Sequence, residues 1–156
     1  MSIYTYLKQD HQKIKHLMSE LEALGQEESD RRSELFNQLK ATIIIHSKAE
    51  EKAFYDPLKN HTKTEDEVEH GEEEHQEAEQ LLSELTDSEL TGAAWYQKFL
   101  SLKESLEHHI EEEENEIFFD AKKVLDGEQA DFMETAMRNE KQRQVADQSI
   151  QKRPNI

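Results

Sequence analysis

The chain contains no cysteine and little glycine or proline, and each shortage narrows what it can be. Its 156 residues include 4 glycines, 2 prolines and no cysteine. The lack of cysteine excludes iron–sulfur clusters, thiolate-bound haem and cysteine catalysis. So few glycines and prolines cannot supply the turns of a β-rich fold. The composition therefore predicts a mainly helical protein built on one domain.

Apolar residues and positive charges are also scarce. Hydrophobic residues make up 34% of the chain, and the formal net charge is −17. So small an apolar fraction predicts a narrow, elongated core, as in a helix bundle. The negative charge argues against binding to nucleic acid or to an anionic membrane surface, because Lys and Arg must neutralise the phosphates there. No apolar run approaches a membrane-spanning length, and MSIYTYLKQDH at the N-terminus has no signal-peptide apolar region, so we expect a cytoplasmic protein.

A helical apolar spacing divides the chain into four long segments. The breaks between them fall at residues 24–30, 57–66, 85–92 and 126–129. Candidate N-caps are Asp30, Thr64 and either Asp87 or Thr91, and candidate helix ends are Gly25 and Gly127. Short connections between long helices predict an all-α, up-down-up-down antiparallel four-helix bundle over residues 1–126. Residues 127–156 are expected to form a C-terminal extension, a short helix followed by a disordered end.

The two halves of the expected bundle resemble each other. DHQKIKHLMSEL (10–21) aligns with EHQEAEQLLSEL (74–85) at an offset of 64 residues. At an offset of 63 residues, His46 and Glu50 fall on His109 and Glu113. A duplicated helical hairpin of this kind predicts an approximate two-fold symmetry. It also favours a site that the two halves share.

Each apolar stripe is interrupted by ionisable residues at positions that should face the core. These are His11 in the first segment, His46 and Glu50 in the second, His75 in the third, and His109 and Glu113 in the fourth. Residues four apart lie on one helical face, so each paired His and Glu can reach the same point. Buried carboxylates without partners are costly or become protonated. Metal ions would resolve this, and imidazoles with bridging carboxylates suit a pair of iron or manganese ions. Zinc is less expected, because its structural sites take four ligands.

The remaining histidines and acidic residues have simpler interpretations. His16, His61, His70 and His108 lie off the stripes and are expected at the surface. Solvent exposure is also expected for Glu51, Glu111, Glu112 and Glu114, and for the acidic run at residues 65–74. An acidic helical bundle with buried but metal-free histidines is the alternative to a metal site.

Four segments of the chain resemble the hemerythrin-like family, in the branch named for its His-His-Glu cation-binding motifs. The matching segments are DHQKIKHL (10–17), HSKAEEKAFYDPL (46–58), EHQEAEQLLSEL (74–85) and HIEEEENEIF (109–118). The resemblance implies a four-helix bundle with two non-haem iron ions joined by an oxo or hydroxo bridge. His11, His46, His75 and His109 would be terminal ligands, and Glu50 and Glu113 would bridge the ions.

One departure from that family separates the chain from the oxygen carriers. Oxygen-carrying hemerythrins have a further histidine in an HxxxH motif on the third helix, but Gly71 stands four residues before His75 here. Glu113 also replaces the aspartate bridge of that group. The departure favours redox chemistry or labile ligands over stable O₂ carriage. Whether His16 or His70 adds a fifth histidine ligand stays open.

The sequence leaves two metal-dependent functions beside the metal-free bundle. One is a di-iron protein that binds or senses O₂, NO, peroxide or iron. The other is a di-iron enzyme of oxidative or nitrosative stress defence, which would reduce peroxide or NO or deliver iron for iron–sulfur cluster repair. Small diatomic ligands or peroxide are the expected partners, and the sequence points to no protein partner. Whether the chain is an enzyme is left open.

Overall fold

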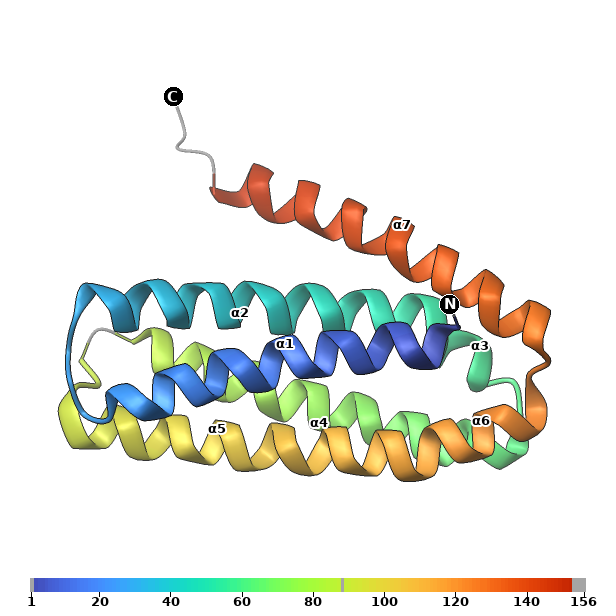
Figure 1. Ribbon diagram of the computed structural model, residues 1–156, viewed down its shortest axis with the longest axis horizontal. Coiled ribbons are helices and arrows are strands. Elements are labelled where there is room, and N and C mark those ends of the chain that lie inside the picture. Colours follow the sequence, from blue (N-terminus) through green and yellow to red (C-terminus); the bar gives the residue numbers. More distant parts are fainter. Residues whose placement is uncertain (1, 88, 153–156) are drawn as a thin grey trace.

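The computed structural model describes residues 2–87 and 89–152, with side chains described as far as residue 147, and these residues form helices joined by short turns. In chain order the elements are α1 (Ile3–Leu24), α2 (Asp30–Glu50), η1 (Glu51–Tyr55), α3 (Asp56–Leu58), α4 (Thr62–Thr86), α5 (Gly92–Glu112), η2 (Glu113–Ile117), α6 (Phe118–Val124) and α7 (Gly127–Lys152). Figure 1 shows α1, α2, α4 and α5 lying lengthwise beside one another as a bundle. The prediction of an all-helical bundle is confirmed. None of the helices in the described ranges combines the length and apolar character that a membrane crossing requires.

Three of the helix ends show which cap predictions hold. Gly25 ends α1 with a positive φ of 62°, a conformation that glycine adopts without steric cost, and Thr91 precedes α5 as its N-cap. The N-cap of α2 is Ser29 and not Asp30, because the Ser29 hydroxyl accepts a hydrogen bond from the backbone N–H of Arg32 at 3.1 Å.

Two other predicted ends are wrong. Thr64 lies inside α4, which begins at Thr62, and its hydroxyl donates to the backbone oxygen of Leu58 at 2.7 Å. Gly127 begins α7 and does not end a helix. The reason is a reciprocal cap, in which the Asp126 carboxylate accepts from the Gln129 N–H at 2.8 Å and the Gln129 side chain accepts from the Asp126 N–H at 2.9 Å.

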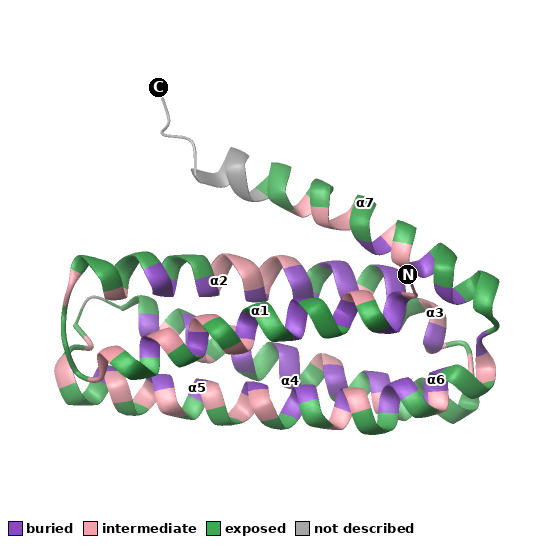
Figure 2. Cartoon of the chain, viewed as in Figure 1, coloured by how far each residue is buried: buried purple, intermediate pink, exposed green. Residues whose placement is uncertain are grey.

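The apolar core is divided into two clusters along the bundle. One cluster lies toward the α1–α2 turn and includes Met18, Leu39 and Phe99. The other lies toward α3 and α6 and includes Phe54 and Phe118. Figure 2 shows the buried residues on the inner faces of the long helices. The buried residues between the two clusters are mostly polar, and they include the six that interrupt the apolar stripes.

The C-terminal helix α7 is longer than expected, with 26 residues. It packs on α1, α2 and η1 through the buried side chains of Ala130, Met133 and Met137, and Figure 1 shows it diverging from the bundle toward its C-terminal end. The residues beyond Met137 are mostly good helix formers. The helix therefore continues although none of the side chains described at residues 138–147 is buried. The sequence predicts a disordered end to the chain, and residues 153–156 of that end lie outside the described residues.

Candidate metal centre

The six residues that interrupt the apolar stripes meet in the polar layer between the two core clusters. These residues are His11, His46, Glu50, His75, His109 and Glu113. Their exposed fractions range from 0% for both glutamates to 5% for His109. The rings of His11 and His46 pack edge to face with their centroids 5.3 Å apart, and the rings of His75 and His109 do so with their centroids 4.8 Å apart. The spacing of the stripes therefore identified side chains that the fold brings together.

Donor atoms of these six side chains form two groups that share both glutamates. His11 and His46 form the first group with Glu50 and Glu113, and His75 and His109 form the second group with the same two glutamates. Within each group one donor atom per residue lies within 4.8 Å of all the others. Such an arrangement offers two positions for metal ions, with each carboxylate placed to reach both.

The Nε2 atoms of the histidines point toward the glutamates. Glu50 Oε1 lies 3.6 Å from His46 Nε2 and 3.2 Å from His75 Nε2. Glu113 Oε1 lies 3.1 Å from His11 Nε2, and its Oε2 lies 3.5 Å from His109 Nε2. Each glutamate thus contacts one histidine from each half of the chain.

The Nδ1 atoms of the same histidines point outward to a second set of carboxylates. The pairs are His11 with Glu114 at 2.6 Å, His46 with Asp10 at 2.8 Å, His75 with Glu51 at 2.7 Å and His109 with Glu74 at 2.9 Å. Metal-ligating histidines commonly donate their other ring N–H to a carboxylate, which fixes the ring and leaves the inner nitrogen as a lone-pair donor. All four imidazoles are held in that orientation.

Sequence reasoning missed these outer carboxylates. Glu51, Glu74 and Glu114 were expected to be solvated, but each one hydrogen-bonds to a buried histidine. A signal was present, because each outer carboxylate is a direct sequence neighbour of one of the six residues. Asp10 and Glu74 also occupy equivalent positions in the two halves, as do Glu51 and Glu114.

A π-helical turn begins at or directly after each inner glutamate. η1 starts one residue after Glu50, and η2 starts at Glu113 itself. Such turns insert a residue into an α-helix and are frequent at functional sites. Tyr55, the last residue of η1, stacks on His75 with the ring centroids 5.4 Å apart. Phe118, directly after η2, stacks on His11 with the ring centroids 6.4 Å apart.

Tyr55 and Phe118 occupy equivalent positions but differ chemically. The Tyr55 hydroxyl donates a hydrogen bond to Glu113 Oε2, which a phenylalanine cannot do. Gly71 makes room for this ring, because a Cβ atom at position 71 would lie 2.8 Å from the Tyr55 hydroxyl oxygen. The Tyr55 ring therefore fills the space beside Gly71.

Burial and the neighbouring charges shift the pKa values of the ionisable groups in this layer. Burial alone would lower the pKa of His11 and His109, but the carboxylates around them raise the pKa of each to about 9. Burial lowers the pKa of His46 to about 4. Burial and the neighbouring Glu113 raise the pKa of Glu50 well above its ordinary value. Burial would also raise the pKa of Glu113, but His109 and His11 hold it well below its ordinary value.

The inner donor atoms fit a metal ion. Several buried atoms have no hydrogen-bond partner among the residues that the structure describes: both oxygens of Glu50, Oε1 of Glu113, and Nε2 of His11, His75 and His109. Buried polar atoms are almost always satisfied, so a group of unsatisfied ones needs an explanation. All of them are lone-pair donors when the imidazoles are neutral, and a pair of cations would satisfy them together.

The four other histidines lie elsewhere. The side chains of His16, His70 and His108 are 74%, 57% and 62% exposed, and His61 is half-buried. His16 contacts Glu20 on its own helix at 3.8 Å, and His70 contacts Glu74 and Glu112. Neither His16 nor His70 is part of the two groups of donor atoms.

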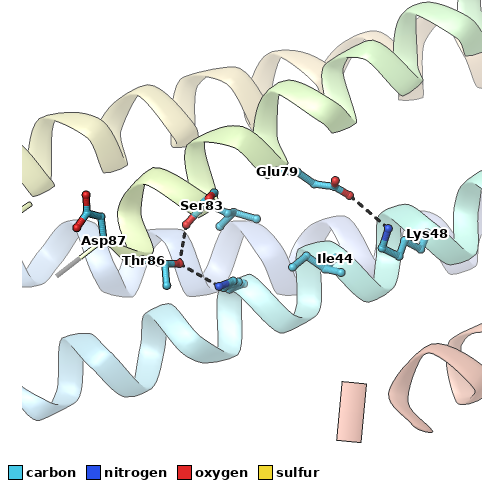
Figure 3. A pocket seen from close by; sticks show the side chains of 8 residues that line it. Ile44, Lys48, Glu79, Ser83, Thr86 and Asp87 are labelled. Atoms are coloured by element: carbon cyan, nitrogen blue, oxygen red, sulfur yellow. Dashed lines mark hydrogen bonds and ion pairs between the residues drawn. The ribbon is translucent and has the colours of Figure 1, made fainter. Parts of the chain in front are cut away.

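A groove between α2 and α4 is separate from this centre. Figure 3 shows Ile44 and Lys48 on one side of it and Glu79, Ser83 and Thr86 on the other. An ion pair between Lys48 and Glu79 crosses it at 3.9 Å. None of the six inner residues lines this groove.

The comparisons with known proteins agree with this geometry. The family model described as the hemerythrin HHE cation binding domain matches residues 2–119, which include all six inner residues and all four outer carboxylates. Neither the curated proteins nor the solved structures give a match to the chain.

Proposed function

Since the chain belongs to the hemerythrin HHE cation-binding family, we propose that it is a non-haem di-iron protein that binds or senses O₂, NO, peroxide or iron. The ions would lie inside an up-down-up-down four-helix bundle. One observation carries the proposal: two groups of buried donor atoms share Glu50 and Glu113, and most of these atoms lack hydrogen-bond partners among the described residues. Manganese or zinc could occupy the same donors, and iron is preferred because imidazole and carboxylate ligands in a helix bundle suit it.

The side chains have separate tasks in this proposal. His11 and His46 would hold one ion and His75 and His109 the other, with Glu50 and Glu113 bridging both. The outer carboxylates keep each Nδ1 protonated, so that each Nε2 presents its lone pair inward. Iron bound there would supply one-electron redox changes and coordination positions for a small ligand.

The net charge supports uptake of a cation. A charge of −17 on a chain of 156 residues raises the local concentration of divalent cations around it. Binding would also release protons, because the neighbouring carboxylates keep His11 and His109 protonated in the metal-free protein. The cations would take over the charge balance that these protons provide.

A second candidate, a di-iron enzyme that reduces peroxide or NO, is favoured by Tyr55. Its hydroxyl is fully buried beside Glu113, and burial and the Glu113 charge raise its pKa well above the ordinary value. The hydroxyl therefore keeps its proton at neutral pH and can donate a hydrogen bond inside the centre. If turnover of peroxide or NO falls in Tyr55→Phe while iron content is kept, the enzyme is the better description.

Anaerobic addition of Fe²⁺, followed by metal analysis and absorption spectra after O₂, NO or peroxide, tests the proposal. We expect two irons per chain and a spectrum that changes with at least one of these ligands. Glu50→Ala and Glu113→Ala should each lose both ions, because each carboxylate belongs to both donor groups. His16→Ala, at an exposed histidine, is the control and should load fully. If the wild-type chain takes up only trace iron, and His46→Ala with His109→Ala leaves its thermal stability unchanged, the proposal is refuted.

A further inference from the structure

A second set of histidines and glutamates lies on the outer side of α4 and α5. His70 and Glu74 are four residues apart on α4, and His108 and Glu112 are four residues apart on α5. The donor atoms of His70, Glu74 and Glu112 all lie within 4.8 Å of one another. His108 Nε2 lies 3.0 Å from Glu112 Oε1 and 3.9 Å from Glu74 Oε2. Two His-x-x-x-Glu pairs therefore face each other across the neighbouring helices α4 and α5.

Glu74 belongs to both the buried centre and this outer set. Its side chain is 10% exposed, and its Oε1 accepts the hydrogen bond from His109 Nδ1. Its other oxygen, Oε2, lies 3.6 Å from His70 Nε2 and 3.9 Å from His108 Nε2. A cleft of about 240 Å³ opens beside it, lined in part by His70 and Glu112. A buried carboxylate thus directs one oxygen outward to two partly exposed imidazoles.

The equivalent position in the first half of the chain shows what this carboxylate lacks. Asp10 is the counterpart of Glu74, and it receives an ion pair from Lys141 on α7. Tyr6, Ile45 and Ala49 stand where His70, His108 and Glu112 stand in the second half. Among the residues that the structure describes, Glu74 has no lysine or arginine partner. In the first half, the ammonium group of Lys141 pairs with the outer carboxylate of Asp10. In the second half, side chains of metal-binding types surround the outer carboxylate of Glu74.

We propose that His70, Glu74, His108 and Glu112 form a surface site for one zinc ion, separate from the buried pair. Two imidazoles and two carboxylates are four ligands of the types that zinc takes. The ion would stand beside Glu74 where Lys141 stands beside Asp10. Glu74 would then link the ion to His109, because its other oxygen accepts the hydrogen bond from His109 Nδ1. The positive charge of the ion would offset the repulsion between Glu74 and Glu112. The site does not require that the buried centre be loaded.

Zinc binding measured by equilibrium dialysis tests this site. The background is Glu50→Ala, which removes a carboxylate from both buried groups and leaves the surface residues untouched. The test variant adds His70→Ala and His108→Ala to this background. The control adds His16→Ala, which removes the histidine of an exposed His-x-x-x-Glu pair. Neither member of this pair belongs to a donor group among the described residues. All of these histidines are at least half exposed, so their removal should not affect folding, which circular dichroism checks.

We expect the test variant to bind one Zn²⁺ fewer per chain than the Glu50→Ala protein, and the His16→Ala control to bind the same number as that protein. An equal count in the test variant would overturn the proposal, since the four side chains would then be only exposed ion pairs. This result is independent of the iron experiment on the buried centre. Failure of the di-iron proposal would leave the zinc difference in place, and failure of the surface site would leave two irons per wild-type chain.

Discussion

A methyl group at position 71 would press on Tyr55 and test how tightly this ring is held beside the metal centre. The Cβ of Gly71→Ala would lie 2.8 Å from the Tyr55 hydroxyl oxygen and 3.1 Å from two of its ring carbons. Real Cβ atoms essentially never approach another atom as closely as the first of these distances. Tyr55 cannot move aside easily, because it is 0% exposed, is stacked on His75 and donates to Glu113.

Two opposing effects set the size of the change. Replacing glycine by alanine inside a helix ordinarily stabilises a protein by about 1 kcal/mol. Forcing an extra carbon into a filled core costs about 1–3 kcal/mol. Since the contact with Tyr55 is at the severe end, we expect a net loss of about 1–2 kcal/mol in the free energy of unfolding of the metal-free protein. The sign is opposite to that of an ordinary helical glycine.

Urea denaturation of four proteins measures this effect as a double-mutant cycle. The proteins are wild type, Gly71→Ala, Tyr55→Leu and the double variant, and the cycle removes the cost of shortening Tyr55 itself. With leucine at position 55 the crowding is gone, so Gly71→Ala should stabilise by up to about 1 kcal/mol. The reasoning is refuted if Gly71→Ala stabilises the wild-type background as much as it stabilises Tyr55→Leu.

Two further predictions concern the outer carboxylates and the protons of the metal-free centre. Asp10→Asn and Glu114→Gln should each weaken metal binding by about 10–100-fold, because the imidazole that each carboxylate orients loses its anionic acceptor. Competition with a chelator measures the affinity, and the variant Glu111→Gln, at an exposed glutamate, should bind metal as tightly as wild type. The metal-free protein should lose stability as pH rises from about 6.5 to 9, because the folded state raises the pKa of His11 and His109 to about 9, and the stabilisation is complete below their ordinary value of 6.5. Urea midpoints across this range measure the loss, and a midpoint that is flat or rises with pH would contradict it.

The inner residues of the centre were predictable from the sequence because helical periodicity selects them. His46 and Glu50 stand at core positions of an apolar stripe, and a charged residue there is informative whatever the details of packing. The repeat of the same pair at His109 and Glu113 then separates the buried pairs from ordinary surface charge. Periodicity fixes the face of a helix on which a residue lies, and both the face and the repeat could be read from the sequence.

The outer carboxylates could not be placed by the same reasoning. Glu51 and Glu114 lie about 100° around the helix from the inner glutamates, so the stripe assigns them to solvent. Their role depends on a neighbouring helix that brings a histidine Nδ1 within 2.7 Å of Glu51 and 2.6 Å of Glu114. The π-helical turns have no sequence signal that we identify. The length of α7 was also underestimated, because its exposed part is held by helix propensity and not by an apolar stripe.

The differences between the halves have a consequence for how such a centre can be built. In a symmetric homodimer of two identical hairpins, every substitution in one hairpin would also be present in the other. Because one polypeptide carries both hairpins here, one half can have Tyr55 where the other has Phe118. Likewise, Lys141 can neutralise Asp10 while Glu74 faces two imidazoles. Covalent fusion thus allows two ion positions of common design to be tuned separately.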